Sequence, residues 1–311
     1  MKSVLKHITQ KKKEFSQLPF FDYLRDESIA PKQRLAFAPC AAPFIMSFGE
    51  LNKNVFRDES SNDPLQAIIN KHTYEDDCHW IWFLEDLEKL GLNRGLSFRD
   101  ALTALWNEET VCAQHVAHEL YHYTHQCSPS QKLVVIEVVE STANVLLTAS
   151  AKIIQSLEAQ THLKYRYFGS GHLDVDAAHT YCSDHIVEVI EGIELTEADR
   201  AEKLEIIDRM FAVFAAFTDE MLAYAKTHPI SSLPPAHQPI RLGTHLLDAG
   251  LITLEQLDIA LLEQQTRNQR IGEILSSHGW VKQQTIEYLM ASVVPTQQQQ
   301  GQHSPSLALM N

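Results

Sequence analysis

Two segments of the chain carry histidine and carboxylate side chains at an unusual, shared spacing. HTYEDDCH spans residues 72–79, and HLDVDAAH spans residues 172–179. In each segment a carboxylate lies between two histidines, which gives His72, Asp76 and His79, then His172, Asp176 and His179. On a helix this spacing places all three side chains on one face. Imidazole and carboxylate suit iron or manganese, so two such helices facing each other can hold a pair of metal ions.

Three further carboxylates extend this set of candidate ligands. Glu75 precedes His79 by one helical turn and is an alternative carboxylate of the first segment. Glu137 and Glu140 lie within the strongly apolar run LVVIEVVESTANVLL. A carboxylate in so apolar a helix is costly unless it is paired or bound to a cation. Both glutamates are therefore candidates to face the histidine segments.

Residues 115–125, HVAHELYHYTH, offer a competing metal motif. His118, Glu119 and His122 match the H-E-x-x-H pattern, in which two histidines bind zinc and the glutamate acts as a base. Glu140 would then be the third zinc ligand. A zincin also needs an edge strand for its substrate, and no convincing strand precedes this segment. A polar, histidine-rich helix face is the simpler interpretation.

The elements that position these residues are predicted to be helices. The chain has 311 residues but only 11 glycines, and alternating β-branched runs are nearly absent. Apolar residues recur instead at steps of three and four, which is typical of amphipathic helices. We expect helices over residues 32–50, 65–90, 98–126, 131–160, 172–194 and 196–226, and therefore an all-α fold.

The proline-rich segment 228–240, HPISSLPPAHQPI, is predicted to be a linker. Proline fixes φ and removes a backbone donor, so such a segment does not continue a helix. A helical bundle is therefore expected over residues 1–227, and a second domain over residues 241–293. The remaining residues, 294–311, are rich in glutamine and low in complexity, so we expect disorder there.

Charge and cysteine usage limit the classes of function. The formal net charge of −14 repels a phosphate backbone, so a nucleic-acid polymer is not an expected partner. Five scattered cysteines argue against a disulfide framework and fit a reducing, cytoplasmic compartment. The most apolar stretch, 133–154, contains charged residues and is expected to be a buried helix, with no membrane span. A homodimer is one option for the oligomeric state.

The second domain is an internal repeat. RLGTHLLDAGLITLEQLDIALLEQ, residues 241–264, recurs as RIGEILSSHGWVKQQTIEYLMASV, residues 270–293. The aligned pairs include Arg241 with Arg270, Gly243 with Gly272, Leu246 with Leu275, Gly250 with Gly279, and Leu257 with Ile286. Self-similarity at a fixed period indicates a repeated supersecondary unit. Each copy is expected to form two short helices, with the second glycine ending the first helix. Thr253 and Gln256 are predicted to form a capping box.

This repeat resembles the MshEN-type N-terminal domain of type II secretion and type IV pilus ATPases, which binds cyclic di-GMP through two such motifs. The resemblance implies that Arg241, Leu242, Gly243, Leu246, Leu257, Leu261 and Gln264 contact one half of that ligand. It implies that Arg270, Ile271, Gly272, Leu275, Ile286 and Met290 contact the other half. The second copy departs from the pattern, because Val293 stands where glutamine is expected. The alternative is a module that docks on a pilus or secretion partner protein.

The bundle resembles the heme-oxygenase-like diiron oxidases, relatives of the thiaminase II and PQQ-synthesis proteins that are often called iron-containing redox enzymes. The segments HTYEDDCHWIWFLEDLEKLG, VVIEVVESTANVLL and YRYFGSGHLDVDAAH look like the three ligand-bearing helices of that family. The resemblance implies a heme-oxygenase-like bundle with these ligands: His172, Asp176 and His179, Glu140 as a bridging or capping ligand, and His79 from the first helix. His72, Glu75 and Asp76 compete for the remaining position, and Glu75 or Asp76 is favoured.

The two resemblances lead to three functional hypotheses. The first is an oxidase or oxygenase that binds two iron ions per chain, or manganese, activates dioxygen on a small-molecule substrate, and binds cyclic di-GMP as a regulator. Members of the family oxidise amines, fatty acids or amino-acid side chains. The second is a non-catalytic signalling protein whose bundle senses iron, oxygen or nitric oxide. The third is a zinc metallopeptidase that uses the H-E-x-x-H segment.

Overall fold

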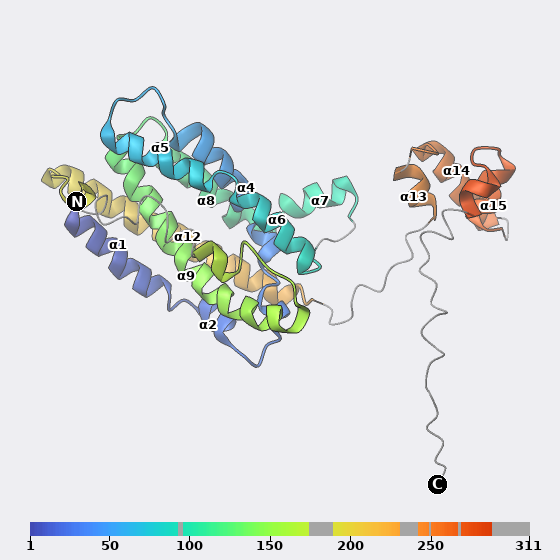
Figure 1. Ribbon diagram of the computed structural model, residues 1–311, viewed down its shortest axis with the longest axis horizontal. Coiled ribbons are helices and arrows are strands. Elements are labelled where there is room, and N and C mark those ends of the chain that lie inside the picture. Colours follow the sequence, from blue (N-terminus) through green and yellow to red (C-terminus); the bar gives the residue numbers. More distant parts are fainter. Residues whose placement is uncertain (93–95, 174–188, 231–241, 249, 267–268, 288–311) are drawn as a thin grey trace, which may run out of the picture. The chain divides into compact units, whose positions relative to one another are not determined.

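The computed structural model describes residues 1–92, 96–173, 189–230, 242–248, 250–266 and 269–287. The chain divides into two compact units, Met1–Ile230 and Ser231–Asn311. The described residues form helices and no strand, so the predicted all-α class is confirmed (Figure 1). Most of the predicted linker 228–240 and the whole of the predicted disordered tail 294–311 lie outside the described residues.

The first unit is a helical bundle built around one long helix. Its helices are α1 (Lys2–Phe15), α2 (Pro19–Arg25), α3 (Pro31–Arg34), α4 (Ala38–Leu51), the π-helix η1 (Asn52–Phe56), α5 (Pro64–Asp76), α6 (His79–Lys89), α7 (Phe98–Leu105), the 3-10 helix η2 (Glu108–Thr110), α8 (Val111–Thr124), α9 (Pro129–Thr161) and α12 (Glu197–Thr227). α9 contacts α1, α2, α3, α5, α8 and α12, so it is the central helix. Ser128 caps its start by accepting the N–H of Gln131, and Pro129 follows at the first position.

α9 combines a strongly apolar composition with burial inside the bundle. It is the one helix among the described residues that is long and apolar enough to cross a membrane by length and composition. The side chains of Leu133, Val134 and Ile136 are completely buried against other helices of the bundle. A core helix of a bundle meets the same criteria of length and composition as a membrane span, and this burial is typical of a core helix.

The predicted helix over 65–90 is wrong as a single element, because the chain breaks between α5 and α6. Arg57 donates a hydrogen bond of 2.8 Å to the carboxylate of Asp77, just past the end of α5. Trp80 of α6 packs directly on Gly49 of α4, where an added Cβ would lie 2.9 Å from the indole ring. These two contacts from other segments redirect the chain, and local helical periodicity does not reveal them.

The predicted helix over 98–126 is also wrong as a single element and is replaced by α7, η2 and α8. The start of α8 is held by Glu220 of α12, whose carboxylate accepts the N–H groups of Cys112 at 2.7 Å and Ala113 at 3.0 Å. A carboxylate there satisfies free helical donors and interacts favourably with the helix dipole. The segment 32–50 is likewise divided into α3 and α4, and most of the predicted helix over 172–194 lies outside the described residues.

The second unit has its own small core and three helices with described bounds, α13 (Leu242–Asp248), α14 (Leu254–Thr266) and α15 (Ile271–Ser277). Gly250 and Gly279 have φ values of 65° and 70°, so both take the left-handed conformation expected after a first helix. Thr253 and Gln256 exchange hydrogen bonds of 2.8 and 3.2 Å, which confirms the predicted capping box. The core consists of Leu246, Ile252, Ala260, Ile274, Leu275, Val281 and Ile286.

Candidate metal centre

Three potential metal ligands from two helices meet inside the bundle. His72 and Asp76 lie on successive turns of α5, and Glu140 projects from α9. The Nε2 atom of His72 is 3.2 Å from Oδ2 of Asp76 and 3.4 Å from Oε1 of Glu140. One ligand atom from each residue lies within 4.8 Å of the other two. Among the described residues, no second group of three potential ligands is this compact.

The electrostatics of this group favour a positive charge at its centre. His72 is 1% exposed and Asp76 is 5% exposed. Burial acts to lower the pKa of His72, but the charges and hydrogen bonds of Asp76 and Glu140 outweigh burial and raise that pKa well above its ordinary value. The raised pKa favours the protonated form of this imidazole between the two carboxylates. A metal ion would compete with this proton for the same position.

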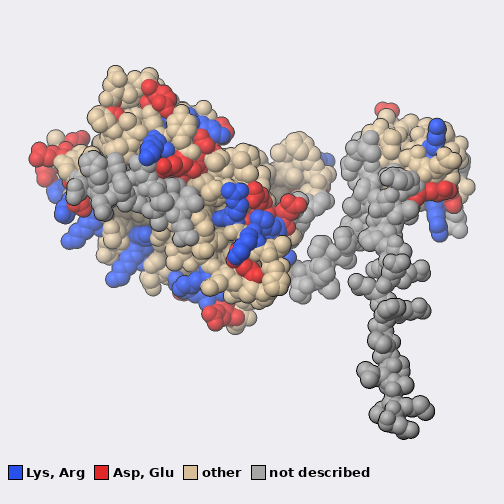
Figure 2. All heavy atoms as spheres, in the orientation of Figure 1, with Lys and Arg blue, Asp and Glu red and all other residues tan. Residues whose placement is uncertain are grey.

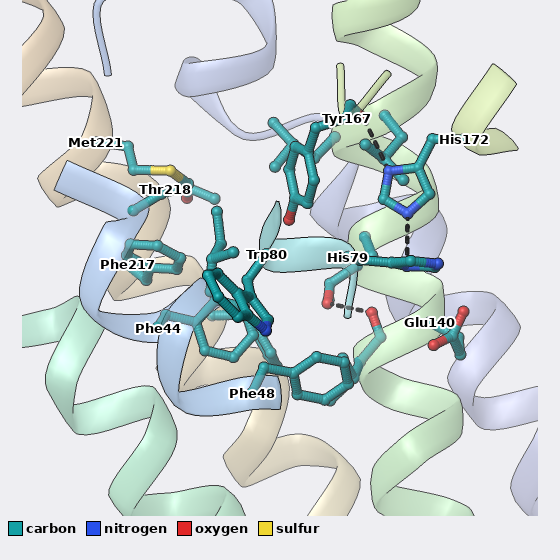
Figure 3. A pocket seen from close by; sticks show the side chains of 18 of the residues that line it. Phe44, Phe48, His79, Trp80, Glu140, Tyr167, His172, Phe217, Thr218 and Met221 are labelled. Carbon is teal, nitrogen blue, oxygen red and sulfur yellow. Dashed lines mark hydrogen bonds between the residues drawn. The ribbon is translucent and has the colours of Figure 1, made fainter. Parts of the chain in front are cut away.

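Two further imidazoles, those of His79 and His172, adjoin the first group. Nε2 of His172 lies 3.0 Å from Nδ1 of His79 (Figure 3). Nδ1 of His79 also lies 3.5 Å from Oδ1 of Asp76. Asp76 thus connects the histidine of α5 with the histidine that begins α6. Although the helix breaks between them, Asp76 and His79 remain neighbours, so the predicted spacing works through a turn rather than one continuous helix face.

The tautomer of His172 follows from its contact with the backbone. Its Nδ1 atom lies 2.8 Å from the carbonyl oxygen of Tyr167. Because a carbonyl oxygen only accepts, Nδ1 must carry the hydrogen, which leaves a lone pair on Nε2. Burial lowers the pKa of His172 and so favours the neutral ring. A histidine held in this way presents Nε2 to a metal ion.

The structure brings together His72, Asp76, His79, Glu140 and His172 from the predicted ligand set. Asp176 and His179 lie outside the described residues. Glu75 lies on α5 but is not a member of the three-ligand group, whose carboxylates are Asp76 and Glu140.

Glu137, the other predicted carboxylate of α9, lies one turn before Glu140 but outside the three-ligand group. Burial, followed by the charge of Glu140, raises the pKa of Glu137 to about 7. Lys12 of α1 lies on the same side of α9, where it donates a hydrogen bond of 2.8 Å to Asn144. The charges of the site therefore affect the pKa of Glu137, although Glu137 is not one of the three grouped ligands.

An apolar pocket opens beside these residues. Its empty volume is about 930 Å³, a figure that includes open solvent at the mouth. Aromatic and other large apolar side chains form most of its wall, among them Phe44, Phe48, Trp80, Phe217 and Met221 (Figure 3). Its polar groups are concentrated at the ligand cluster, with Asp76, His79, Glu140 and His172. No lysine or arginine of the described residues lines the pocket. Apolar periodicity in a sequence does not distinguish a pocket wall from a packed core.

The H-E-x-x-H segment of α8 has different surroundings. His118 and His122 are exposed. Glu119 forms an ion pair of 3.3 Å with Arg209 of α12. Glu140, the proposed third zinc ligand, lies instead beside His72. The described residues therefore do not assemble the three-ligand zinc site that the motif suggested.

The residues predicted to contact cyclic di-GMP occupy three kinds of position in the second unit. Gly243, Leu246, Gly272, Leu275 and Ile286 are buried, Leu242, Leu257 and Ile271 are half-buried, and Leu261, Gln264 and Arg270 are exposed. Arg241 and Met290 lie outside the described residues. An added Cβ would lie 2.5 Å from Leu257 at Gly243 and 3.0 Å from Ile286 at Gly272. Helix packing thus accounts for both glycines, and the ligand contacts stay a prediction.

The donor chemistry of the bundle cluster fits a metal ion such as iron or manganese. It combines two carboxylates with three imidazoles, and both ligand types bind these metals. The buried positions of His72 and Asp76 give an ion a site that is shielded from bulk water. No protein-family model matches the chain, and no curated protein matches it either.

Proposed function

We propose that the bundle is a dinuclear iron oxidase or oxygenase, with manganese as the alternative metal, that activates dioxygen on a small and largely apolar substrate. The observation that carries this proposal is the convergence of two carboxylates and three imidazoles at one end of an apolar pocket. Burial of several ionisable side chains is costly, and a bound metal ion would offset that cost. A metal ion held beside an apolar pocket could act on a substrate bound in that pocket.

Each part of the chain would have a distinct task in this reaction. His72, Asp76, His79, Glu140 and His172 would hold the metal ions. Bound iron would supply the redox chemistry with dioxygen that side chains lack. Asp76 orients His72 and His79 through its two oxygens. The carbonyl of Tyr167 keeps the proton of His172 on Nδ1, away from the cluster.

The pocket wall would select the substrate and exclude water. Phe44, Phe48 and Phe217 offer aromatic surface but no hydrogen-bonding group. A substrate with an apolar body would therefore bury that body against these rings. Its more polar end would lie toward His79 and Glu140, where the polar side chains of the pocket are concentrated.

Metal analysis of protein loaded anaerobically with ferrous iron tests the proposal first. We expect close to two irons per chain, and a marked loss of iron in His72→Ala and in His172→Ala. His122→Ala is the matched control, since it removes an exposed histidine of α8, and it should retain the iron. Zinc that is lost in His118→Ala but kept in His172→Ala would instead support a metallopeptidase.

Oxygen consumption separates catalysis from sensing. Iron-loaded protein is mixed with apolar amines, carboxylic acids and aromatic compounds under air, and oxygen uptake is followed with an electrode. Uptake that depends on one compound class, and that disappears in His172→Ala, would support the oxidase. Stable binding of two irons with no uptake across the panel would favour the signalling alternative.

We infer that the second unit binds cyclic di-GMP, as its resemblance implies. What supports this is the repeated motif in the sequence, and the matching contacts of Gly243 with Leu257 and of Gly272 with Ile286 support only a shared packing of the two copies. Titration calorimetry with cyclic di-GMP should give saturable binding that weakens in Arg270→Ala, because arginine offers a planar donor fork to guanine or phosphate. Lys282→Ala is a control outside the repeat pattern. Absence of binding would favour docking on a pilus or secretion partner protein.

A further inference from the structure

A buried aspartate on α6 holds the loop that leads to His172. Asp86 is 0% exposed and lies two turns beyond His79 on the same helix. Its Oδ1 atom accepts the backbone N–H of Arg166 at 2.9 Å, and its Oδ2 atom accepts those of Tyr167 at 2.8 Å and Phe168 at 3.0 Å. Three consecutive backbone donors thus converge on one carboxylate.

Simple packing does not require a charge at this position. Phe83, one turn earlier on α6, already packs its ring against Tyr167 and Phe168 with centroids 5.3 and 6.1 Å away. A buried carboxylate is costly unless it is fully hydrogen-bonded, and an apolar side chain often stabilises a core equally well. Unlike an apolar side chain, Asp86 fixes the orientation of the loop backbone as well as its distance from α6, because hydrogen bonds are directional.

The hydrogen bonds of Asp86 continue to the metal-ligand candidates through a single residue. The N–H of Tyr167 donates to Asp86, and the carbonyl of Tyr167 accepts from Nδ1 of His172. Nε2 of His172 then meets Nδ1 of His79 at 3.0 Å. His79 and Asp86 both belong to α6, so this series of hydrogen bonds starts and ends on the same helix. α6 therefore sets the separation of two imidazoles that are 93 residues apart in the sequence.

We propose that Asp86 is a positioning residue that holds His172 in one orientation and one tautomer, with Nε2 directed at the metal centre. This inference rests on the proposed function for its purpose, because it assigns His172 as a ligand. Asp86 itself is neither a lining residue of the pocket nor a member of the three-ligand group.

Nitrogen-15 NMR of the metal-free protein tests the position of the proton directly. The His172 signals are assigned by their loss in His172→Gln. In the unmodified protein we expect the hydrogen on Nδ1 alone. In Asp86→Asn the amide NH₂ replaces one acceptor oxygen and opposes the loop N–H groups, so we expect a mixture of tautomers. Cobalt(II) binding, followed by its visible absorption, should weaken by about 10- to 100-fold, as for other residues that orient metal ligands.

Two controls separate positioning from general stability. Glu85→Gln alters the adjacent residue, whose ion pairs are with the side chains of Lys89 and Arg166, and it should leave the tautomer and the cobalt affinity unchanged. Phe83→Leu loosens the packing of the same loop. It should lower the thermal midpoint, measured by circular dichroism, and keep the hydrogen on Nδ1.

Two results would overturn the inference. One is a hydrogen on Nε2 of His172 in the unmodified protein, which decides the matter even if Asp86→Asn does not fold. The other is a folded Asp86→Asn variant with the original tautomer and the original cobalt affinity. If the unmodified protein binds neither cobalt nor iron, the proposed metal function fails, while the tautomer comparison still decides the role of Asp86.

Discussion

α5 and α8 both carry a histidine one turn away from an acidic residue, but they place that pair in different surroundings. On α5, His72 is 1% exposed, and it lies against the carboxylates of Asp76 and Glu140. On α8, His115 pairs with Glu119 at 3.3 Å, but its side chain is 49% exposed. Figure 2 shows acidic and basic side chains interspersed on the visible surface of the first unit. Water screens the pair on α8, whereas burial leaves the α5 group few ways to satisfy its charges.

Spacing alone does not identify a metal site. The H-E-x-x-H match on α8 is the better-known motif, yet its histidines face solvent and its glutamate pairs with Arg209. The α5 segment becomes a candidate centre because α9 adds Glu140 from the opposite side. Depth in the bundle, and a ligand from a second helix, distinguish the two regions.

The largest expected effect comes from removing the central carboxylate of the α5 group. Asp76→Ala leaves a buried, protonated imidazole with one fewer charge partner, which should lower the free energy of unfolding of the metal-free protein by about 3–5 kcal/mol. Glu119→Ala on α8 is the matched control and should cost far less, because its partners are exposed. Urea denaturation of the metal-free proteins measures both. Equal losses at the two positions would remove the distinction between the regions.

The break between α5 and α6 should be sensitive to one methyl group. Gly49→Ala places a Cβ 2.9 Å from the Trp80 ring and 3.1 Å from the carbonyl of Asp77. The resulting overpacking should lower the free energy of unfolding by about 1–3 kcal/mol. It should also weaken metal binding by displacing His79. Gly171→Ala is the control, since nothing lies within 4 Å of its added Cβ. Chemical denaturation and cobalt titration would record both consequences.

The raised pKa of His72 predicts two opposite dependences on pH. Its ion pairs stabilise the metal-free fold fully below the unfolded-state pKa, and this stability is lost as pH rises through the higher folded-state pKa. Metal affinity should change the other way, rising by up to about tenfold per pH unit below the folded-state pKa, because the ion displaces one proton. Cobalt titrations between pH 6 and 8 would reveal the slope. His72→Gln should abolish it, and a slope that survives in this variant would assign the proton to another group.

The smallest effect is expected on α8. The double variant His118→Ala, His122→Ala removes two exposed imidazoles and should change the free energy of unfolding by no more than about 0.5 kcal/mol. Iron content and oxygen uptake should match those of the unmodified protein. Loss of iron or of activity in this variant would return α8 to consideration as the metal-binding helix.

Much of the fold follows from local features of the sequence. Apolar periodicity predicted α9 and α12 to within a few residues. Gly250 and Gly279 end helices in the second unit as expected, and Thr253 with Gln256 forms the predicted cap. These features depend on hydrogen bonds and side-chain contacts within about one helical turn, so a single sequence contains the information.

The candidate centre was only partly predictable. The sequence alone nominated His72, Asp76, His79, Glu140 and His172, because histidine and carboxylate are conspicuous at these positions. It did not favour Asp76 over Glu75, and it did not single out Asp86. One signal for Asp86 was present, since an aspartate close behind the apolar run WIWFL must find partners if its side chain is buried. The sequence does not say which partners.

Helix content, turn glycines and candidate ligand types were thus determined by the sequence itself. Tertiary structure decided where helices break, as at Asp77 and ahead of α8, and which histidines are buried. It also joined Glu140 to His72 and connected Asp86 to His172 through Tyr167. The physical reason is range: helical periodicity acts over a few residues, whereas this site depends on hydrogen bonds between side chains up to 93 residues apart, which only the packing of the bundle brings together.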